Sequence, residues 1–193
     1  MNLLEEIKLK GNPAEIPDCK RKDLPGFFKN LGFKVGVEIG VYLGEFTKLL
    51  AMEGFKIYGV DPWLIYSDLG SKHRQGAYDA FYKMAQNALV PYPNVELIRK
   101  TSMDAVKDFG DGSLDFVYID ANHKFRYIAE DIYEWSKKVR TGGIVSGHDY
   151  SISGMCQVKP VVDAYTTAFD IKQWFVLGKR HQGQEKSWLW FKE

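Results

Sequence analysis

The sequence predicts an α/β fold, in which helices cover both faces of a doubly wound, mostly parallel sheet. The first observation behind it is an alternation of strand-like and helix-like segments between residues 35 and 150, which is typical of a parallel sheet. The second is a pair of strand-like runs near the C-terminus, joined by a polar stretch, which predicts an antiparallel hairpin. The third is the length of 193 residues, which suits one domain with its own apolar core.

Residues 1–33 lack this alternation, and we assign them to a cap segment that precedes a domain of residues 34–193. Apolar residues in the segment suggest two small helices, and a Pro-containing stretch between them suggests a loop. The helices are expected near residues 3–7 and 27–31, and the loop over residues 11–25. We expect the segment to lie over the sheet, close to the substrate.

The predicted strands are short runs rich in Val, Ile, Tyr or Phe, most of them bracketed by turn residues. The five strands of the parallel part are Val35–Ile39, Lys56–Val60, Val95–Arg99, Leu114–Ile119 and Gly143–Ser146. The hairpin strands are Ile171–Leu177 and Ser187–Phe191, joined by residues 178–186. If this hairpin is exposed, it could support a homodimer.

Between the strands, apolar residues recur at helical spacing and predict amphipathic helices. The three stripes are Phe46, Leu49 and Leu50; Tyr78, Phe81, Tyr82, Ala85 and Leu89; and Ile128, Ile132, Trp135 and Val139. A further helix is expected to begin near Pro160. The five tryptophans are expected in the core, and the polar residues 66–76 suit either a lid or a plain loop.

Charge and cysteine content narrow the class of protein. The 26 basic and 25 acidic side chains leave a formal charge of +1, which disfavours nonspecific binding to nucleic acid. The two cysteines, Cys19 and Cys156, form no C-x-x-C motif and are expected to be reduced thiols. The N-terminus carries acids where a signal peptide needs bases, and no apolar run approaches the roughly 18 residues of a membrane span. We therefore expect a cytoplasmic protein that acts on a small molecule, away from membranes.

A nucleoside pocket is predicted by the run from Val35 to Gly44 together with Asp61. A short strand enters a glycine turn and a helix, and a second strand ends in Asp61, whose carboxylate can bind two ribose hydroxyls. Glu38, Gly40 and Gly44 form the spacing E-x-G-x-x-x-G, which differs from the G-x-G-x-x-G of dinucleotide-binding folds. A carboxylate at Glu38 repels a diphosphate and attracts a sulfonium, so an NAD-dependent oxidoreductase is disfavoured.

This pattern resembles the first motif of the class I S-adenosylmethionine-dependent methyltransferases, whose Rossmann-like seven-stranded sheet also ends in an antiparallel return. The resemblance implies that Glu38 lies near the methionine part of the cofactor and that Gly40 and Gly44 let the turn pass beneath it. Ser102 and Met103 follow the third strand, where this fold touches adenine, so Met103 would cover the base and Ser102 would hydrogen-bond to it. Ser102 equally suits the N-cap of a helix over residues 103–109, and one residue can do both.

A second polar cluster follows the fourth and fifth predicted strands. Asp120 and Asp149 fall at the carboxyl ends of these strands, and adjacent strands lie about 4.8 Å apart, so the two carboxylates can converge. His123 and His148 stand close to them in the sequence. Two converging carboxylates either hold a divalent cation or serve as base and partner for a hydroxyl nucleophile.

The runs I-D-x-x-H and G-G-I-x-x-x-H-D-Y, on either side of a predicted helix, are similar to those of metal-dependent O-methyltransferases that act on sugars and catechol-type hydroxyls. This likeness implies that Asp120 and Asp149 are ligands of Mg²⁺ or Mn²⁺, with His148 at the third position and Asp120 also beside the cofactor. The third position differs from both groups of relatives. The catechol-type enzymes place Asn where this chain has Tyr150, and the sugar enzymes place an acid where it has His148.

These patterns together predict an S-adenosylmethionine-dependent methyltransferase that acts on a hydroxyl of a small molecule or sugar. Without a metal, His148 is the leading general base, because an imidazole with a pKa near 6.5 accepts a proton at neutral pH, and His123 is the second candidate. One alternative is an aminopropyltransferase-like enzyme, which uses decarboxylated S-adenosylmethionine on the same fold. Another is a nucleoside-binding module without catalytic activity.

Overall fold

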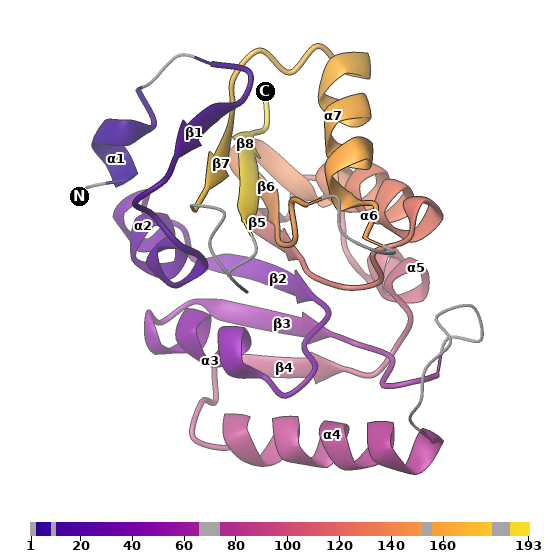
Figure 1. The fold of residues 1–193 in the computed structure, drawn as a ribbon. Coiled ribbons are helices and arrows are strands. Elements are labelled where there is room, and N and C mark those ends of the chain that lie inside the picture. The colour runs from indigo at the N-terminus through magenta and orange to yellow at the C-terminus, as the bar shows by residue number, and fades with distance from the viewer. Residues whose placement is uncertain (1–2, 9–10, 66–73, 152–155, 179–185) are drawn as a thin grey trace.

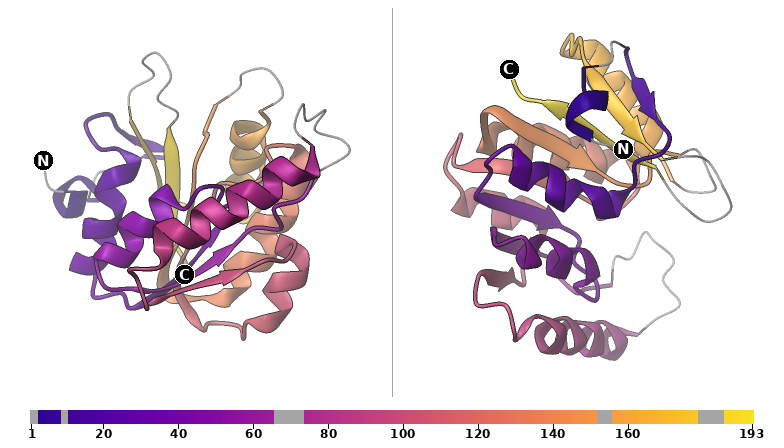
Figure 2. Two further views of the ribbon diagram at one scale, coloured as in Figure 1. Left: turned by 90° about the horizontal axis from the view of Figure 1, so that it is seen from below. Right: turned by 90° about the vertical axis from the view of Figure 1, so that its left-hand side faces the viewer.

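The structure, a computed structural model, describes residues 3–8, 11–65, 74–151, 156–178 and 186–193 of the chain. These residues form one sheet of eight strands with helices on both faces, as Figures 1 and 2 show. The predicted α/β class is therefore confirmed. Most of the candidate lid and most of the connection inside the C-terminal hairpin lie outside the described residues.

The sheet is mixed, with one antiparallel strand among parallel ones. In spatial order its strands are β1 (Ala14–Ile16), β7 (Trp174–Leu177), β8 (Ser187–Phe191), β6 (Val139–Gly147), β5 (Leu114–Ile119), β2 (Val35–Ile39), β3 (Lys56–Val60) and β4 (Val95–Ile98). Strand β8 runs antiparallel to β6 and β7, and every other pair is parallel. The predicted return by an antiparallel hairpin is confirmed.

Two groups of helices cover the sheet (Figure 1). On one face lie α1 (Leu3–Glu6), the 3-10 turn η1 (Arg21–Asp23), α2 (Leu24–Asn30) and α3 (Glu45–Met52). On the other lie α5 (Ser102–Ala105), the 3-10 turn η3 (Val106–Asp108), α6 (Phe125–Lys138) and α7 (Val158–Ala168). Helix α4 (Gln75–Leu89) packs beside α3, beyond the β4 edge of the sheet.

Strand β5 shows why the central strands are continuous apolar runs in the sequence. All six of its residues are buried. Side chains alternate between the two faces of a strand, so Phe116 and Tyr118 enter the core under α2 and α3. Val117 and Ile119 enter the core under α6 and α7. A strand that is covered on both faces needs apolar residues at most positions, as is usual for parallel sheets. All five tryptophans are buried too, as expected.

Four predictions about these elements were wrong. The sheet has eight strands rather than seven, because residues 14–16 of the expected loop form β1 and pair with β7. Strand β6 begins at Val139, which helical spacing places in the preceding helix, and β7 begins at Trp174 rather than Ile171. The hairpin is not exposed either, since β1 pairs with the outer edge of β7, and β8 pairs with β6 on its other side. This removes the reason for expecting a dimer through the hairpin.

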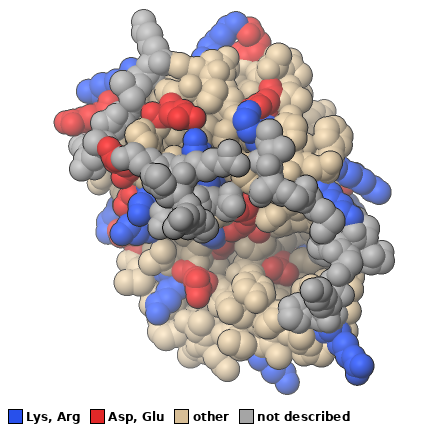
Figure 3. Space-filling view, viewed as in Figure 1, with Lys and Arg blue, Asp and Glu red and all other residues tan. Residues whose placement is uncertain are grey.

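The surface agrees with the small net charge. Acidic and basic side chains are interspersed over the face shown in Figure 3, without a large region of one sign. A strongly basic face would be the usual mark of nucleic-acid binding, and it is not seen on this side of the molecule. None of the helices that the structure describes has the length and apolar composition needed to cross a lipid bilayer.

Candidate active site

The carboxyl ends of strands β2, β3, β5 and β6 lie side by side, and two cavities open at this edge of the sheet. The first cavity has a volume of about 380 Å³, and its lining includes Gly40, Asp61, Ser102, Met103, Asp120 and Asp131. The second has a volume of about 470 Å³, and its lining includes Arg21, Lys22, Phe46, Asp120 and His123. Both are lined by Gly40, Tyr42, Asp120 and Ala121, so the two cavities meet at the ends of β2 and β5.

Asp61 ends β3 and holds the glycine turn that follows β2. Its Oδ2 accepts hydrogen bonds from the backbone amides of Val41, at 3.1 Å, and Tyr42, at 3.0 Å, and its Oδ1 accepts one from the amide of Trp63, at 2.7 Å. Burial raises the pKa of Asp61, and these backbone donors oppose that shift. Because a carboxylate oxygen accepts about two hydrogen bonds, Oδ1 keeps capacity for a ligand in the first cavity. The contact between Asp61 and the ribose stays a prediction. Holding the glycine turn is a second role of the same carboxylate.

Gly40 lets the glycine turn lie directly against the end of β5. Its φ is +91°, and a Cβ atom built on it would lie 2.1 Å from the backbone oxygen of Asp120. Two hydrogen bonds of 2.8 Å fix this contact, from Gly40 N to Val60 O and from Asp120 N to Ile39 O. Only glycine fits a position that needs both a left-handed φ and this close approach.

Ser102 and Met103 both line the first cavity, at the start of α5. The N-cap of that helix is Thr101, whose hydroxyl accepts a hydrogen bond from the amide of Asp104, so the N-cap assignment for Ser102 was wrong. The Ser102 hydroxyl donates to the Asp131 carboxylate and accepts from Nε1 of Trp135, at 2.7 Å. Its one proton is therefore already in use, although its oxygen can accept another hydrogen bond.

Asp131 is a buried carboxyl group in the wall of the first cavity. It is 4% exposed, and burial raises its pKa to about 7, although the Ser102 hydrogen bond partly offsets this. The native state therefore binds this proton more tightly than the unfolded chain, in which an Asp titrates near 4, so folding stability falls as pH rises from about 4 to about 7.

The variant Asp131→Asn has no carboxyl group at this position, so its stability should not fall in this way as pH rises. Between pH 5 and pH 8 we expect its free energy of unfolding to gain about 1 kcal/mol or more relative to the wild type, the value of one pKa unit. Urea unfolding at both pH values measures this. Glu38, whose pKa burial also raises, is present in both proteins and cancels from the difference. An equal pH dependence in the two proteins would show that Asp131 is ionised in the native state.

Asn122 presents a hydrogen-bond donor that has no acceptor among the described residues. The residue is 8% exposed and lines the first cavity, and its Nδ2 is buried and unpaired. Its Oδ1 accepts a hydrogen bond from the amide of Lys124, at 3.1 Å, which fixes the side chain. A buried donor without an acceptor is unfavourable, so a ligand with acceptor atoms fits this wall.

Glu38 lies beneath the turn, outside the lining of both cavities. It is 1% exposed, and its carboxyl group accepts hydrogen bonds from the Thr47 hydroxyl and from Nη2 of Arg21, the latter at 3.4 Å. Burial raises its pKa to about 8 despite the nearby guanidinium, so Glu38 carries little charge at neutral pH. Glu38 therefore repels a diphosphate only weakly, so the glycine spacing is the remaining difference from dinucleotide-binding folds.

Asp149 follows β6 and is bonded to both candidate histidines. Its Oδ2 lies 2.9 Å from Nε2 of His123, and its Oδ1 lies 3.2 Å from Nδ1 of His148. Although burial opposes it, these hydrogen bonds hold the pKa of Asp149 well below its usual range. The residue has a φ of +54°, and Tyr42 and Trp63 beside the first cavity also have positive φ. Such strained residues often gather at functional sites.

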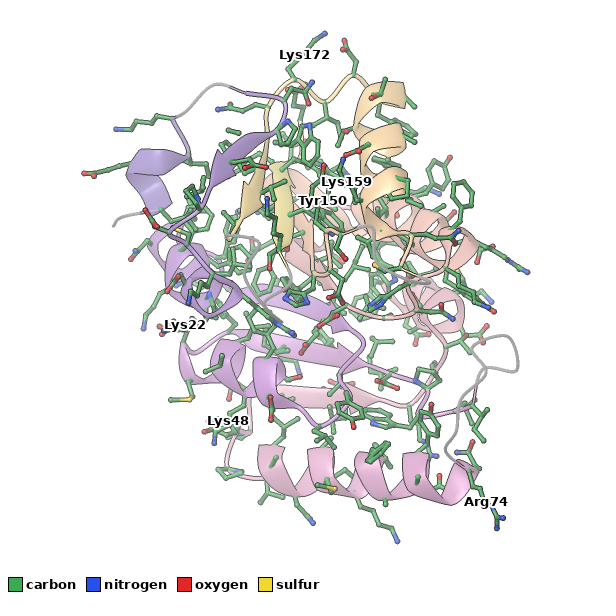
Figure 4. The ribbon with its side chains drawn as sticks, viewed as in Figure 1. Lys22, Lys48, Arg74, Tyr150, Lys159 and Lys172 are labelled. Atoms are coloured by element: carbon green, nitrogen blue, oxygen red, sulfur yellow. The ribbon has the colours of Figure 1, made fainter. Side chains whose placement is uncertain are left out.

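A network from α7 holds the Asp149 turn in place. The Tyr150 hydroxyl donates to Asp163 at 2.6 Å, and Nζ of Lys159 donates to the other oxygen of Asp163. Figure 4 shows Tyr150 and Lys159 side by side, and the ammonium of Lys159 lies 4.9 Å from the centre of the Tyr150 ring. The residue after Asp149 is thus fixed by side chains of α7.

His123, rather than His148, reaches the second cavity. The His123 side chain is 38% exposed and belongs to the lining, whereas His148 is 17% exposed and lines neither cavity. The Asp120 and Asp149 carboxylates raise the pKa of His123 to about 10, and the nearer contact is with Asp149, since Asp120 lies 3.9 Å away. His148 contacts Asp149 and also lies 3.9 Å from Oδ1 of Asp120.

Sequence reasoning missed Arg21, which comes from η1 in the N-terminal segment. Its Nη1 lies 2.8 Å from Oδ2 of Asp120, and its guanidinium stacks over the Phe46 ring at 4.3 Å and the Tyr118 ring at 5.1 Å. The N-terminal segment thus contributes Arg21 and Lys22 to the second cavity, and its nearness to a substrate stays a prediction. No local pattern marks Arg21, because its partners are far away in the sequence.

The arrangement does not fit a hexacoordinate Mg²⁺ ion. Ligand atoms of Asp120, His123 and Asp149 lie within 4.8 Å of one another, so the grouping contains His123 where the resemblance suggested His148. It offers only two carboxylates, whereas Mg²⁺ prefers oxygen ligands in octahedral geometry. Asp120 is also paired with Arg21, and both oxygens of Asp149 are bonded to imidazoles.

Comparison with known proteins gives a family and a fold. A family model described as a methyltransferase domain matches residues 37–150. No match was found among curated proteins. At 13–14% identity, the likeness to the following solved structures shows a shared fold alone.

The first is the O-methyltransferase TomG from Streptomyces achromogenes, in complex with SAM, which has a TM-score of 0.64 and 14% identity over 90% of this chain and 79% of that chain. The second is the O-methyltransferase from Bacillus cereus in complex with SAH, with a TM-score of 0.63 and 14% identity over 99% and 87% of the two chains. The third is an rRNA methylase from Streptococcus thermophilus, with a TM-score of 0.65 and 13% identity over 92% and 99%.

Proposed function

Because the chain belongs to the methyltransferase domain family whose model matches residues 37–150, we propose that it transfers a methyl group from S-adenosylmethionine to a hydroxyl oxygen of a small molecule. The observation that carries this proposal is the meeting of two cavities at Gly40 and Asp120, with a histidine–carboxylate pair in the second. One cavity can hold a methyl donor while the other holds an acceptor. The small net charge argues against a nucleic-acid acceptor.

The first cavity is the cofactor site. Asp61 binds the ribose hydroxyls through its free acceptor capacity, and the turn at Gly40 brings backbone close to the methionine part. Met103 covers the adenine, and Asn122 donates its unpaired Nδ2 hydrogen to an acceptor atom of the cofactor. The Asp131 carboxyl, held by Ser102, lies in the same wall and is a candidate partner for a polar edge of the base. S-adenosylmethionine supplies a methyl group that its sulfonium already activates.

The second cavity is the acceptor site. The protein there has to align the hydroxyl oxygen with the methyl carbon and remove its proton. His123 receives the proton, and Asp149 orients the imidazole in the manner of the carboxylate in a histidine–aspartate pair. His148 acts on the other oxygen of Asp149, so it positions the carboxylate and does not touch the acceptor. The two free thiols, Cys19 and Cys156, suit a reducing compartment such as the cytoplasm.

Asp61→Ala tests the cofactor site. We expect the affinity for S-adenosylmethionine and S-adenosylhomocysteine to fall about 100-fold or more, because two hydrogen bonds to a charged group are lost and each contributes about 1.5–3 kcal/mol. Isothermal titration calorimetry measures the affinities. Asp61→Asn keeps one acceptor oxygen and should have an intermediate effect, while Asp111→Ala, a change at an exposed ion pair, should have none.

Two outcomes would count against the proposal. Unchanged affinity in Asp61→Ala would remove this residue from the ribose. Wild-type protein that binds NAD but neither S-adenosylmethionine nor S-adenosylhomocysteine would overturn the function itself. The transfer reaction is measured with catechols and methyl glycosides as acceptors, and the product should gain the mass of a methyl group rather than of an aminopropyl group.

A further inference from the structure

Arg21 places a permanent positive charge in the wall of the second cavity, against Asp120, which lines both cavities. Its guanidinium bonds to Asp120 through Nη1, at 2.8 Å, and to Glu38 through Nη2, at 3.4 Å. Asp120 is the residue that the resemblance assigns to a metal ion. We propose that Arg21 is the resident cation of the acceptor site, that it takes the place of a divalent metal at Asp120, and that methyl transfer by this chain is therefore independent of metal. This inference rests on the proposed function.

The contacts around Arg21 make it a fixed part of the site. Its guanidinium lies over the aromatic rings of Phe46 and Tyr118, which attract a cation through their faces. The turn that carries it is closed by a hydrogen bond of 2.8 Å from the amide of Lys20 to the carboxylate of Asp23. An arginine stays charged at every pH at which proteins fold, so this cation does not depend on conditions.

A divalent ion at Asp120, His123 and Asp149 would compete directly with Arg21. It would have to share the carboxylate of Asp120 with Arg21, whose Nη1 lies 2.8 Å from Oδ2, and it would stand beside a guanidinium of the same sign. It would also have to displace the imidazoles of His123 and His148 from Asp149. The donor set that could bind a metal is thus already satisfied by cationic and N–H groups of the chain itself.

The guanidinium also has a role in the reaction. The residue lines the second cavity, and its Nε is buried and has no acceptor among the described residues. The positive charge of the guanidinium stabilises an acceptor oxygen in this cavity as the oxygen becomes negative. The hydroxyl proton passes to His123, the oxygen forms its bond to the methyl carbon, and the electrons of the broken carbon–sulfur bond remain on sulfur, which gives the methyl ether and S-adenosylhomocysteine.

Mn²⁺ binding to the free protein tests the proposal without reference to activity. Electron paramagnetic resonance should detect no tight Mn²⁺ site in the wild type. Arg21→Gln should bind Mn²⁺ at least about tenfold more tightly than the wild type, since it removes the repulsion of a like charge a few ångströms away. Adding Asp149→Asn to that variant should remove the gained site. Lys29→Gln removes a positive charge that is paired with Glu53 and lies outside the lining of both cavities, so it should bind Mn²⁺ as the wild type does.

Methyl transfer provides the second measurement. Wild-type activity should be unchanged by EDTA, and Arg21→Gln should lose activity and recover part of it when Mn²⁺ is added. Arg21→Lys keeps the charge and should still exclude Mn²⁺, so it provides the test if Arg21→Gln does not fold. Tight Mn²⁺ binding by the wild type, or loss of its activity in EDTA, would overturn the proposal. Binding of S-adenosylhomocysteine separates the two proposals, because a chain that binds none fails the proposed function whatever the Mn²⁺ result.

Discussion

His123→Ala is expected to lower kcat by about 10²–10⁴, the usual contribution of a positioned general base, with little change in the affinity for S-adenosylhomocysteine. The imidazole lines the second cavity and is held by Asp149, so its loss affects the acceptor rather than the cofactor. His148→Ala should have a smaller effect, because His148 contacts Asp149 and Asp120 but lines neither cavity. Initial rates with the most active acceptor, together with calorimetry, measure both variants.

The pKa of His123 gives this prediction a pH dependence. The Asp120 and Asp149 carboxylates raise it to about 10, so the imidazolium predominates below that pH and must release its proton before it can accept one. A bound sulfonium is a like charge that lowers this pKa, but the active form still grows as pH rises. We expect kcat to increase between about pH 7 and pH 9. A flat profile, or a larger loss in His148→Ala than in His123→Ala, would contradict the assignment of the base.

The central part of the fold could be predicted because its signals are local. Strands β2, β3 and β5 have the predicted bounds, since each is an apolar run closed by turn residues. The elements that were missed depend on tertiary contacts. Strand β1 is three residues long, and it exists because the edge of β7 is open to pairing. Val139 continues the helical spacing of α6, yet pairing with β5 draws it into β6.

The candidate site, too, has residues that local sequence signals predict and residues that depend on tertiary contacts. Glycine spacing and strand-end acids are visible in the sequence, because parallel strands bring their carboxyl ends to one edge. The sequence ranks His148 above His123 as the general base, whereas in the structure His123 lines the second cavity and His148 does not. Which imidazole faces a cavity depends on the folded chain. Arg21 could not be found at all, because its partners Glu38 and Asp120 lie on or directly after two other strands and only the folded chain brings the three together.

Gly40→Ala is expected to be strongly destabilising. A left-handed φ costs an alanine about 1 kcal/mol, and overlap of the new Cβ atom with the backbone oxygen of Asp120, 2.1 Å away, adds a further cost of about 1–3 kcal/mol. The overlap is with backbone, so no side-chain rotation relieves it. The end of β2 must therefore move away from β5, and both cavities share that boundary. We expect a lower Tm and loss of S-adenosylhomocysteine binding even where the variant is folded.

Gly54→Ala is the matched control, because it separates backbone strain from close contact. Gly54 has a φ of +90°, nearly that of Gly40 at +91°, but a Cβ atom on it meets nothing within 4 Å. It should lower Tm by only about 2–4 °C, the shift expected for about 1 kcal/mol in a protein of this size, and should bind S-adenosylhomocysteine normally. Differential scanning calorimetry and titration calorimetry compare the two variants. If both variants lose the same stability and both still bind S-adenosylhomocysteine, the loss of stability comes from φ alone. The contact between Gly40 and Asp120 then does not shape the site.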